Sequence, residues 1–382
     1  MGTRRPEWNH WAVIVLAGML IESAVAQGED DNVLAAIEVA RNGASLIVPI
    51  ESQGVVYNYV VGTGTSTMMV ESKLAANWTP HRFVNSGTAN GIVKLPAYRR
   101  PEEVFLAGFT LRRNAEVGAA SFHDMSETTG IKIDGIVGMN DLKQFIIQID
   151  FDRGQLRFLE SVPDDCGDKF RLSFERGIPD VQWTVGDNQI TACVATDQEV
   201  DVSLNRIAFD LLLERNRIDS TGTIPSTTAG GERKCQSGTL RELNLGKFQH
   251  TNLEVQCMAV NGLGLGFLSR YLVTFDFPRQ TMYLKPGRDF NRPRNRDYLG
   301  LIVIRHDNKV VVESVKKGTP AELAGIRPGD VLQQVNGKDT ANELLFDLRR
   351  RLCTHAGASM KLRIERDGKP HDVTVKLLPK VE

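Results

Sequence analysis

The sequence of 382 residues is short of cysteine, of net charge and of long apolar runs. Its five cysteines are an odd number without metal-ligand spacing, so at most two disulfides can form, and buried thiols are an equal alternative. A formal charge of −1 gives no broad attraction to nucleic acid or to an anionic membrane. Neither an HExxH pattern nor a GxSxG pattern occurs, and we expect no metal and no organic cofactor.

The amino-terminal segment has the three parts of a secretory signal peptide. Arg4 and Arg5 give a basic start, an uncharged run over residues 11–21 follows, and Ala24-Val25-Ala26 supplies small residues for cleavage. A helix over the uncharged run would be about 17 Å long, which is too short for a hydrocarbon core of about 30 Å. We therefore predict a signal peptide over residues 1–26 rather than a membrane anchor. Cleavage near Ala26 would release the mature chain into the periplasm or the medium, with no membrane span.

From about Ser45 to Gly287 the pattern is typical of an all-β protein. Short segments rich in β-branched and aromatic residues are separated by Gly, Pro, Asn and Asp. Residues 138–159 recur as residues 264–285 without a gap, at an offset of 126. Asp150 and Asp276 are equivalent in the two copies, which predicts a shared structural role before a hairpin turn. Two copies of one unit indicate a gene duplication and a β domain with two equivalent halves.

A second module follows a charged, aperiodic stretch over residues 288–296, which is typical of a linker. The pattern beyond the linker mixes strands with helices. We expect strands at 300–304, 309–315, 331–335, 359–366 and 371–378, and helices at 320–324 and 342–352.

The first module resembles the pepsin and retropepsin family of aspartic proteases. In each half of that family a strand leads to an Asp-Thr-Gly or Asp-Ser-Gly turn, and an apolar pair ending in glycine packs beneath it. Residues 134–139 (DGIVGM) match this second element, and residues 261–266 (NGLGLG) are its looser counterpart. The resemblance implies a mainly β, two-lobed pepsin-like (acid protease) domain.

The two turns that would carry the catalytic aspartates lack them. The family's Asp-Thr-Gly falls on Gly62, Thr63 and Gly64 in the first lobe, and on Ala195, Thr196 and Asp197 in the second. A shift of two residues in the second lobe would instead put Asp197 in the catalytic position. The family's mechanism needs two carboxylates that share one proton, and loss of one general acid or base costs about 10²–10⁴-fold in rate. The resemblance therefore implies a pseudoenzyme.

The second module resembles the PDZ domain attached to bacterial periplasmic serine proteases, a domain of the α+β class. The matching residues are 298–301 (YLGL), 324–332 (AGIRPGDVL) and 335–337 (VNG). The resemblance implies a loop that binds a peptide carboxylate and an edge strand to which an extended peptide adds. The implied peptide-binding residues are Leu299, Gly300, Leu301, Val303, Leu345 and Leu348.

Together these patterns give a signal peptide (1–26), two aspartic-protease-like lobes (40–164 and 165–287), a linker (288–296) and a PDZ domain (297–382). We expect an exported binding protein that takes peptides or protein C-termini in its PDZ groove, with envelope proteins as candidate partners. The alternative is an active aspartic endopeptidase with a displaced catalytic dyad and PDZ-assisted recruitment of substrate. We favour the first, because Gly62 offers neither a proton acceptor nor a group to hold the attacking water.

Overall fold

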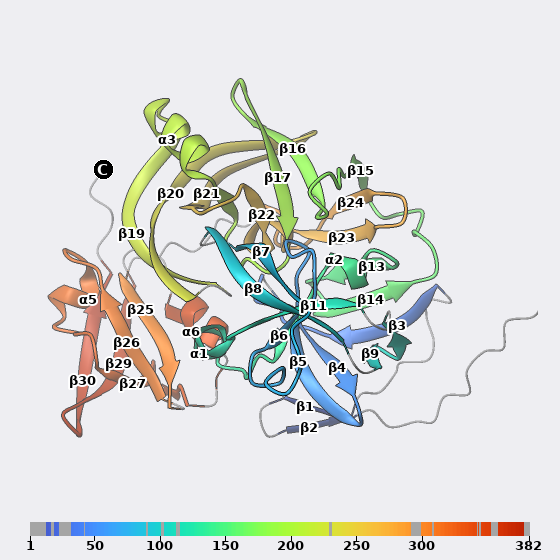
Figure 1. Ribbon diagram of the computed structural model, residues 1–382. Coiled ribbons are helices and arrows are strands. Elements are labelled where there is room, and N and C mark those ends of the chain that lie inside the picture. Colours follow the sequence, from blue (N-terminus) through green and yellow to red (C-terminus); the bar gives the residue numbers. More distant parts are fainter. Residues whose placement is uncertain are drawn as a thin grey trace, which may run out of the picture.

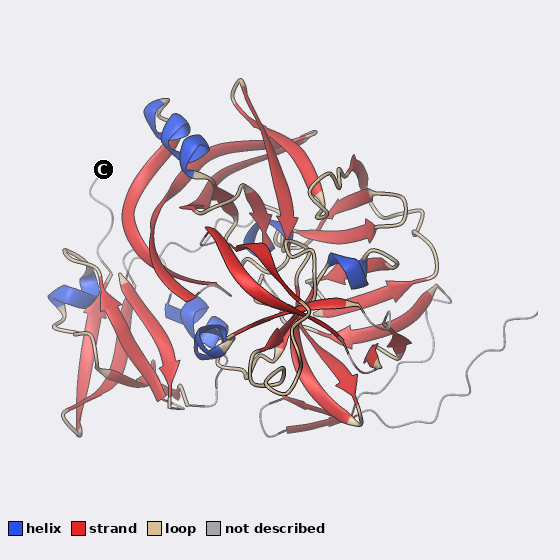
Figure 2. Cartoon of the chain, in the orientation of Figure 1, coloured by secondary structure: helices blue, strands red, loops and turns tan. Residues whose placement is uncertain are grey.

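The protein is mainly β, and in the computed structural model the strands of the described residues form five sheets (Figures 1 and 2). The structure describes residues 13–16, 19–22, 32–41, 43–88, 91–100, 103–111, 115–228, 231–291, 299–307, 309–341, 343, 345–352 and 358–377. Its helices are short: α1 (His123–Thr129), α2 (Met139–Leu142), α3 (Arg206–Glu214), α4 (Leu265–Leu268), α5 (Pro320–Leu323) and α6 (Leu345–Leu352).

The predicted signal peptide lies largely outside the described residues. Within it, only the pairing of β1 (Val13–Leu16) with β2 (Met19–Glu22) is described. Across the described ranges, no helix is both long enough and apolar enough to cross a membrane.

A nine-stranded sheet occupies the first part of the chain. Its strands follow the order β10-β9-β4-β5-β12-β6-β11-β8-β7. Their bounds are β4 (Ile47–Ser52), β5 (Val55–Val61), β6 (Met69–Glu71), β7 (Arg82–Thr88), β8 (Gly91–Arg99), β9 (Val104–Leu106), β10 (Phe109–Thr110), β11 (Glu116–Ala120) and β12 (Gly135–Val137).

A seven-stranded sheet is built from the second part of the chain, in the order β16-β17-β22-β18-β21-β20-β19. Its strands are β16 (Asp180–Val185), β17 (Asn188–Ala195), β18 (Val202–Leu204), β19 (Ile218–Thr228), β20 (Gly231–Leu245), β21 (Phe248–Cys257) and β22 (Gly262–Gly264). Fully buried large side chains such as Trp183 and Phe209 anchor it, each worth about 1.5–3 kcal/mol of burial.

The two sheets share one local pattern. In the first, β12 pairs in parallel with β5 and antiparallel with β6, and β6 pairs in parallel with β11. In the second, β22 pairs in parallel with β17 and antiparallel with β18, and β18 pairs in parallel with β21. The internal repeat of the sequence therefore corresponds to a repeat in strand pairing.

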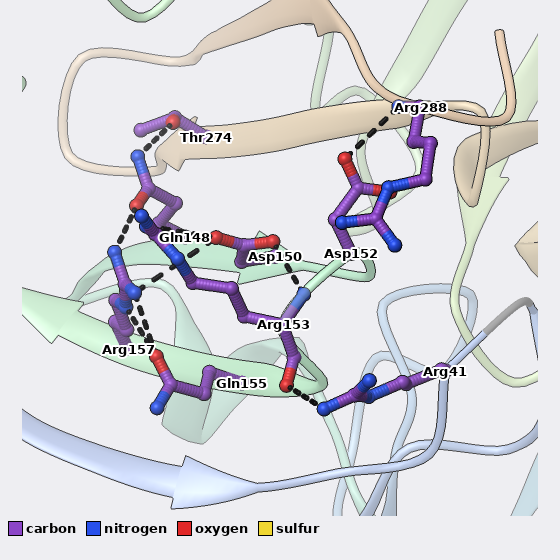
Figure 3. A network of polar contacts seen from close by, with 9 residues as sticks. All are labelled: Arg41, Gln148, Asp150, Asp152, Arg153, Gln155, Arg157, Thr274 and Arg288. Atoms are coloured by element: carbon purple, nitrogen blue, oxygen red, sulfur yellow. Dashed lines mark hydrogen bonds and ion pairs between the residues drawn. The ribbon is translucent and has the colours of Figure 1, made fainter.

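A six-stranded sheet joins the two copies, in the order β15-β24-β23-β13-β14-β3. Its strands are β3 (Val33–Glu38), β13 (Ile146–Asp150), β14 (Gln155–Leu159), β15 (Asp168–Arg171), β23 (Tyr271–Asp276) and β24 (Thr281–Pro286). Gln148 stands opposite Thr274, its equivalent at the offset of 126, and its Nε2 donates to Thr274 Oγ1 over 3.1 Å. The equivalent strands β13 and β23 are thus neighbours at the centre of the sheet, and Figure 3 shows the contact between Gln148 and Thr274.

Asp150 and Asp276 close the equivalent hairpin turns of this sheet. Asp150 Oδ1 accepts from the backbone N–H of Arg153 over 2.9 Å, and Asp276 Oδ1 accepts from that of Arg279 over 3.1 Å. Each arginine guanidinium also reaches its own aspartate. The structure therefore shows the shared structural role that the repeat predicted, and Figure 3 shows the first copy with its neighbours.

The carboxy-terminal module has its own sheet, in the order β25-β26-β27-β29-β30, with β28 paired to β27. Its hydrophobic core is separate from the core of the preceding sheets. The strands are β25 (Leu301–His306), β26 (Lys309–Val315), β27 (Val331–Val335), β28 (Lys338–Asp339), β29 (Ser359–Arg366) and β30 (Lys369–Lys376). Helices α1 and α6 lie side by side where this module meets the nine-stranded sheet (Figure 1).

Candidate functional site

Two sets of predicted site residues can be placed, and the first lies where the two large sheets meet. The backbone N–H of Thr63 donates to Thr196 Oγ1, and the N–H of Thr196 donates to Thr63 Oγ1, each over 3.0 Å. The hydroxyls then cross to the opposite chain segment. Thr63 Oγ1 donates to the carbonyl of Val194 over 2.5 Å, and Thr196 Oγ1 donates to that of Val61 over 2.6 Å. Thr63 and Thr196 are therefore structural counterparts, and both are buried.

Gly62 and Gly64, on either side of Thr63, lie where neighbouring atoms leave little room for a side chain. A Cβ atom on Gly62 would lie 2.4 Å from Ile136 Cγ2, so position 62 has no room for a carboxylate in this arrangement. A Cβ atom on Gly64 would lie 2.6 Å from Asp197 Oδ1. On the opposite side Ala195 is fully buried and pairs with Gly264. The predicted positions 62 and 195 hold no ionisable group.

Asp197 occupies the centre between these segments. Its Oδ2 accepts from the Thr65 hydroxyl over 2.8 Å, and its Oδ1 is buried although the residue as a whole is partly exposed. Burial raises the pKa of Asp197, and the hydrogen bond from Thr65 opposes that rise. Asp197 is therefore a hydrogen-bonding group of the junction, and its neutral form is favoured.

The second set of predicted residues lies in the carboxy-terminal module. β25 is the edge strand of its sheet in the described residues, and α6 packs beside it. Gly300, at the start of β25, has a φ of 72°, and a Cβ atom there would lie 2.4 Å from the Thr319 side chain. Its carbonyl accepts from the N–H of Lys316 over 2.8 Å, and the carbonyl of Leu299 accepts from that of Ala321 over 3.0 Å. These bonds fix the loop that the sequence assigned to a peptide carboxylate.

Five of the six residues predicted to bind a peptide are buried apolar residues. They belong to one hydrophobic cluster: Leu299, Leu301, Val303, Leu345 and Leu348. On β25 the buried residues alternate with the half-buried Ile302 and Ile304. The predicted residues thus pack between β25 and α6, the two elements that flank the expected peptide groove, and the two isoleucines point to the opposite face of the sheet.

Two arginines of this groove were missed by the sequence reasoning. Arg349 on α6 donates from Nη2 to the carbonyl of Val303 over 2.8 Å, and so ties the helix to the edge strand. Arg305 on β25 donates to the carbonyls of Ala341 and Glu343, each over 2.6 Å, at the chain segment that leads into α6. The run of three arginines at 349–351 was the available signal for Arg349, because a guanidinium has five N–H donors that need acceptors where it is partly buried.

Metal-binding side chains do not gather in the part of the chain that the structure describes, where no group of three or more His, Cys, Asp or Glu could hold an ion. Four of the five cysteines are described, and all four are buried thiols: Cys166, Cys193, Cys235 and Cys257.

Comparison with known proteins identifies the carboxy-terminal module. Residues 297–377 match the family model of the PDZ domain. The chain is 34% identical over 97 residues to a probable CtpA-like serine protease of Staphylococcus saprophyticus, and 31% identical over 91 residues to one of Staphylococcus aureus. These matches cover 25% and 23% of this chain, but only 20% and 18% of the relatives.

One solved structure, the photosystem II D1 C-terminal processing protease, matches at 23% sequence identity with a TM-score of 0.21. The match covers 23% of this chain and 25% of that chain. A TM-score this low carries no argument about fold.

The relatives overturn the predicted family. They are named as serine proteases, so the identification of the chain as a pepsin or retropepsin homologue is wrong. The pseudoenzyme interpretation, with Gly62 and Ala195 in place of catalytic aspartates, is wrong with it, and so is the alternative of an active aspartic endopeptidase. What stands is a mainly β chain with a PDZ domain.

The motif misled for a physical reason. Gly-Thr-Gly and the apolar pair ending in glycine are residues that allow backbone and side chains to approach closely, and they have this packing role in the structure. Gly62 is packed against Ile136, and the Thr63 hydroxyl bonds the backbone of the opposite segment. Such a pattern carries information about packing, and none about carboxylate chemistry.

Proposed function

We propose that this chain serves protein processing by binding the carboxy-terminal segments of other proteins in its PDZ groove. The observation that supports this most directly is the edge strand β25 beside α6, with the loop at Leu299 and Gly300 at its start. An extended peptide can add to such an edge through its backbone, and a loop of this kind can take its terminal carboxylate. The CtpA-like names of the relatives favour protein processing as the setting.

Titration with paired peptides tests the proposal. Fluorescein-labelled decapeptides that end in Ala, Val or Leu are titrated against the full chain, as free acids and as C-terminal amides, and anisotropy gives both dissociation constants. We expect the free acid to bind at least tenfold more tightly, because amidation removes the charge that the loop receives; tenfold corresponds to about 1.4 kcal/mol. Equal affinity of the two forms would eliminate carboxylate recognition.

A second candidate function is hydrolysis of peptide bonds by a serine nucleophile, which the names of the relatives favour. A fluorophosphonate reagent labels an activated serine covalently and labels an ordinary one hardly at all. If the chain is such an enzyme, the native protein is labelled and the heat-denatured protein is not. Equal or absent labelling of the two leaves peptide binding as the function.

The division of the chain that goes with this function is also a proposal. It has a signal peptide over residues 1–26, β units over 40–164 and 165–287, a linker at 288–296 and the PDZ domain over 297–382. The repeated strand pairing and the separate core of the PDZ domain support the division.

Export to the periplasm or the medium, where envelope proteins would be the partners, predicts a mature chain that begins at Gln27. Amino-terminal sequencing of the secreted protein checks this.

A further inference from the structure

Helix α1, which belongs to the nine-stranded part of the molecule, lies against the PDZ groove. It contacts β25 and α6, the two elements that form the groove (Figure 1). Gly130 ends α1 with a φ of 75°. A Cβ atom at Gly130 would lie 2.9 Å from Arg305 Nε and 3.7 Å from the Cβ of Leu345. The end of α1 therefore rests where the last residues of β25 face the first residue of α6.

Polar side chains meet at the same contact. Glu127 Oε2 of α1 lies 3.4 Å from His306 Nδ1 at the end of β25. Burial lowers the pKa of Arg305, and the carboxylates of Glu127 and Glu343 oppose that fall. The contact therefore excludes water from an arginine of the groove and places a carboxylate of α1 beside it.

The contact covers the path that a bound peptide would follow. A peptide with its carboxylate at Gly300 runs antiparallel to β25, so its upstream residues pass Ile304, Arg305 and His306. β25 spans six residues, or about 20 Å at about 3.3 Å for each. A ligand of more than about five residues would meet α1 there. Along the groove, Val303 also has its carbonyl already bonded to Arg349.

We propose that α1 and Gly130 form a lid over the PDZ groove, and that a protein C-terminus binds only after the PDZ domain moves away from this lid. The inference rests on the proposed function, because it names a restraint on the same groove. No residue of α1 is fully buried, so the lid is a surface element that can separate without opening a hydrophobic core. The apparent affinity for a ligand then equals the intrinsic affinity multiplied by the fraction of open molecules.

A reversible cross-link tests the lid. The separation of 3.7 Å between a Cβ atom at Gly130 and that of Leu345 is suited to a disulfide, so the double variant Gly130→Cys/Leu345→Cys can be locked by oxidation. The labelled free-acid decapeptides are titrated against the oxidised variant and against the same sample after reduction. We expect oxidation to weaken binding at least tenfold and reduction to restore it. Equal affinity before and after reduction would overturn the lid.

A charge reversal tests it from the other direction. Glu127→Arg places a cation beside His306 and Arg305, so it should open the lid and tighten peptide binding by about tenfold if the closed form predominates tenfold. Asp124→Arg makes the same charge change at an exposed position of the same helix and should leave the affinity unchanged. Equal affinities of Glu127→Arg and wild type would contradict the lid.

The lid and the proposed function fail in different ways. If free-acid and amidated peptides bind every variant equally or not at all, the proposed carboxylate recognition is wrong, and the proposed lid is wrong as well. If the free acids are preferred but neither the lock nor the charge reversal changes their affinity, only the lid is wrong.

Discussion

At the scale of single residues, the junction between the two large sheets depends on Thr63 and Thr196. Each hydroxyl accepts from the other residue's backbone N–H and donates to a carbonyl across the junction. A buried N–H or carbonyl that loses its partner costs about 1–3 kcal/mol. Two side chains thus hold together segments that are 133 residues apart in sequence.

Replacement of Thr196 by valine tests how much these hydrogen bonds contribute to stability. Thr196→Val keeps the shape and removes the hydroxyl, so the Thr63 N–H and the Val61 carbonyl lose their partner. We expect a loss of about 1–3 kcal/mol of unfolding free energy for each unpaired group, measured by urea denaturation. Thr191→Val is the matched control, because Thr191 is an exposed residue of β17, the strand that ends next to Thr196. A loss no larger than that of the control would show that the paired threonines contribute little.

Asp197 should give stability an unusual dependence on pH. Its pKa is raised in the folded protein, so between the unfolded pKa, about 3.9, and the folded one the native state holds more protons than the unfolded chain. Stability from this group is therefore lost as pH rises. We expect the unfolding free energy of Asp197→Asn to increase relative to that of wild type as pH rises. Urea denaturation at pH 4, 5.5 and 7, followed by tryptophan fluorescence, measures both values. A constant difference between the two proteins would refute the shifted pKa.

At the scale of elements, the turn before β27 is fixed by Asp330. The carboxylate accepts from Arg366 Nε over 2.7 Å and Nη2 over 2.6 Å, and from the backbone N–H of Arg327 over 2.8 Å. Burial opposes the charged form, but these hydrogen bonds outweigh burial and lower the pKa of Asp330. The hydrogen bonds of this turn therefore join the start of β27 to the end of β29.

Asp330→Asn should lower the stability of the PDZ domain and leave that of the preceding β sheets unchanged. The charged hydrogen bonds are worth about 1.5–3 kcal/mol at neutral pH. The difference from wild type should shrink as the pH falls below the unfolded pKa of about 3.9 toward the lowered pKa of folded Asp330. Hydrogen exchange of the β27 amides at pH 7 and pH 3 measures this, with Asp367→Asn at an exposed turn as control. The tryptophan signal should not move, because no tryptophan lies in residues 297–382. Unchanged exchange in Asp330→Asn would contradict the assignment.

Elements with a clear periodic pattern were predictable, and surface elements without one were not. The strand at 331–335 was predicted with the bounds it has, and the helix predicted at 342–352 is described from Leu345. Within the predicted all-β region, β9 and β10 are separated by a turn at Ala107 and Gly108, both with positive φ, which the pattern of apolar residues did not mark. Helix α1 (HDMSETT) was missed, since it has no apolar periodicity and no fully buried residue.

At the scale of the whole molecule, the repeat indicated that strand patterns recur, and the PDZ motif correctly predicted a PDZ domain. The chemistry of the first site was not predictable in the same way. Gly62 and Thr63 serve the packing of segments that are distant in sequence. Residues chosen for packing can match a family motif without any relationship to that family. The contact of α1 with the groove depends on how two separately packed cores meet, which local sequence does not encode.

Hydrogen exchange of the full chain with a saturating free-acid decapeptide tests the central claim, that a protein C-terminus adds to the edge of β25. We predict slower exchange of the amides of Leu301–His306, and faster exchange over α1 as its contact with the groove is lost. The amidated peptide at the same concentration should produce neither change. Unchanged exchange along β25, with protection elsewhere or nowhere, would contradict the account.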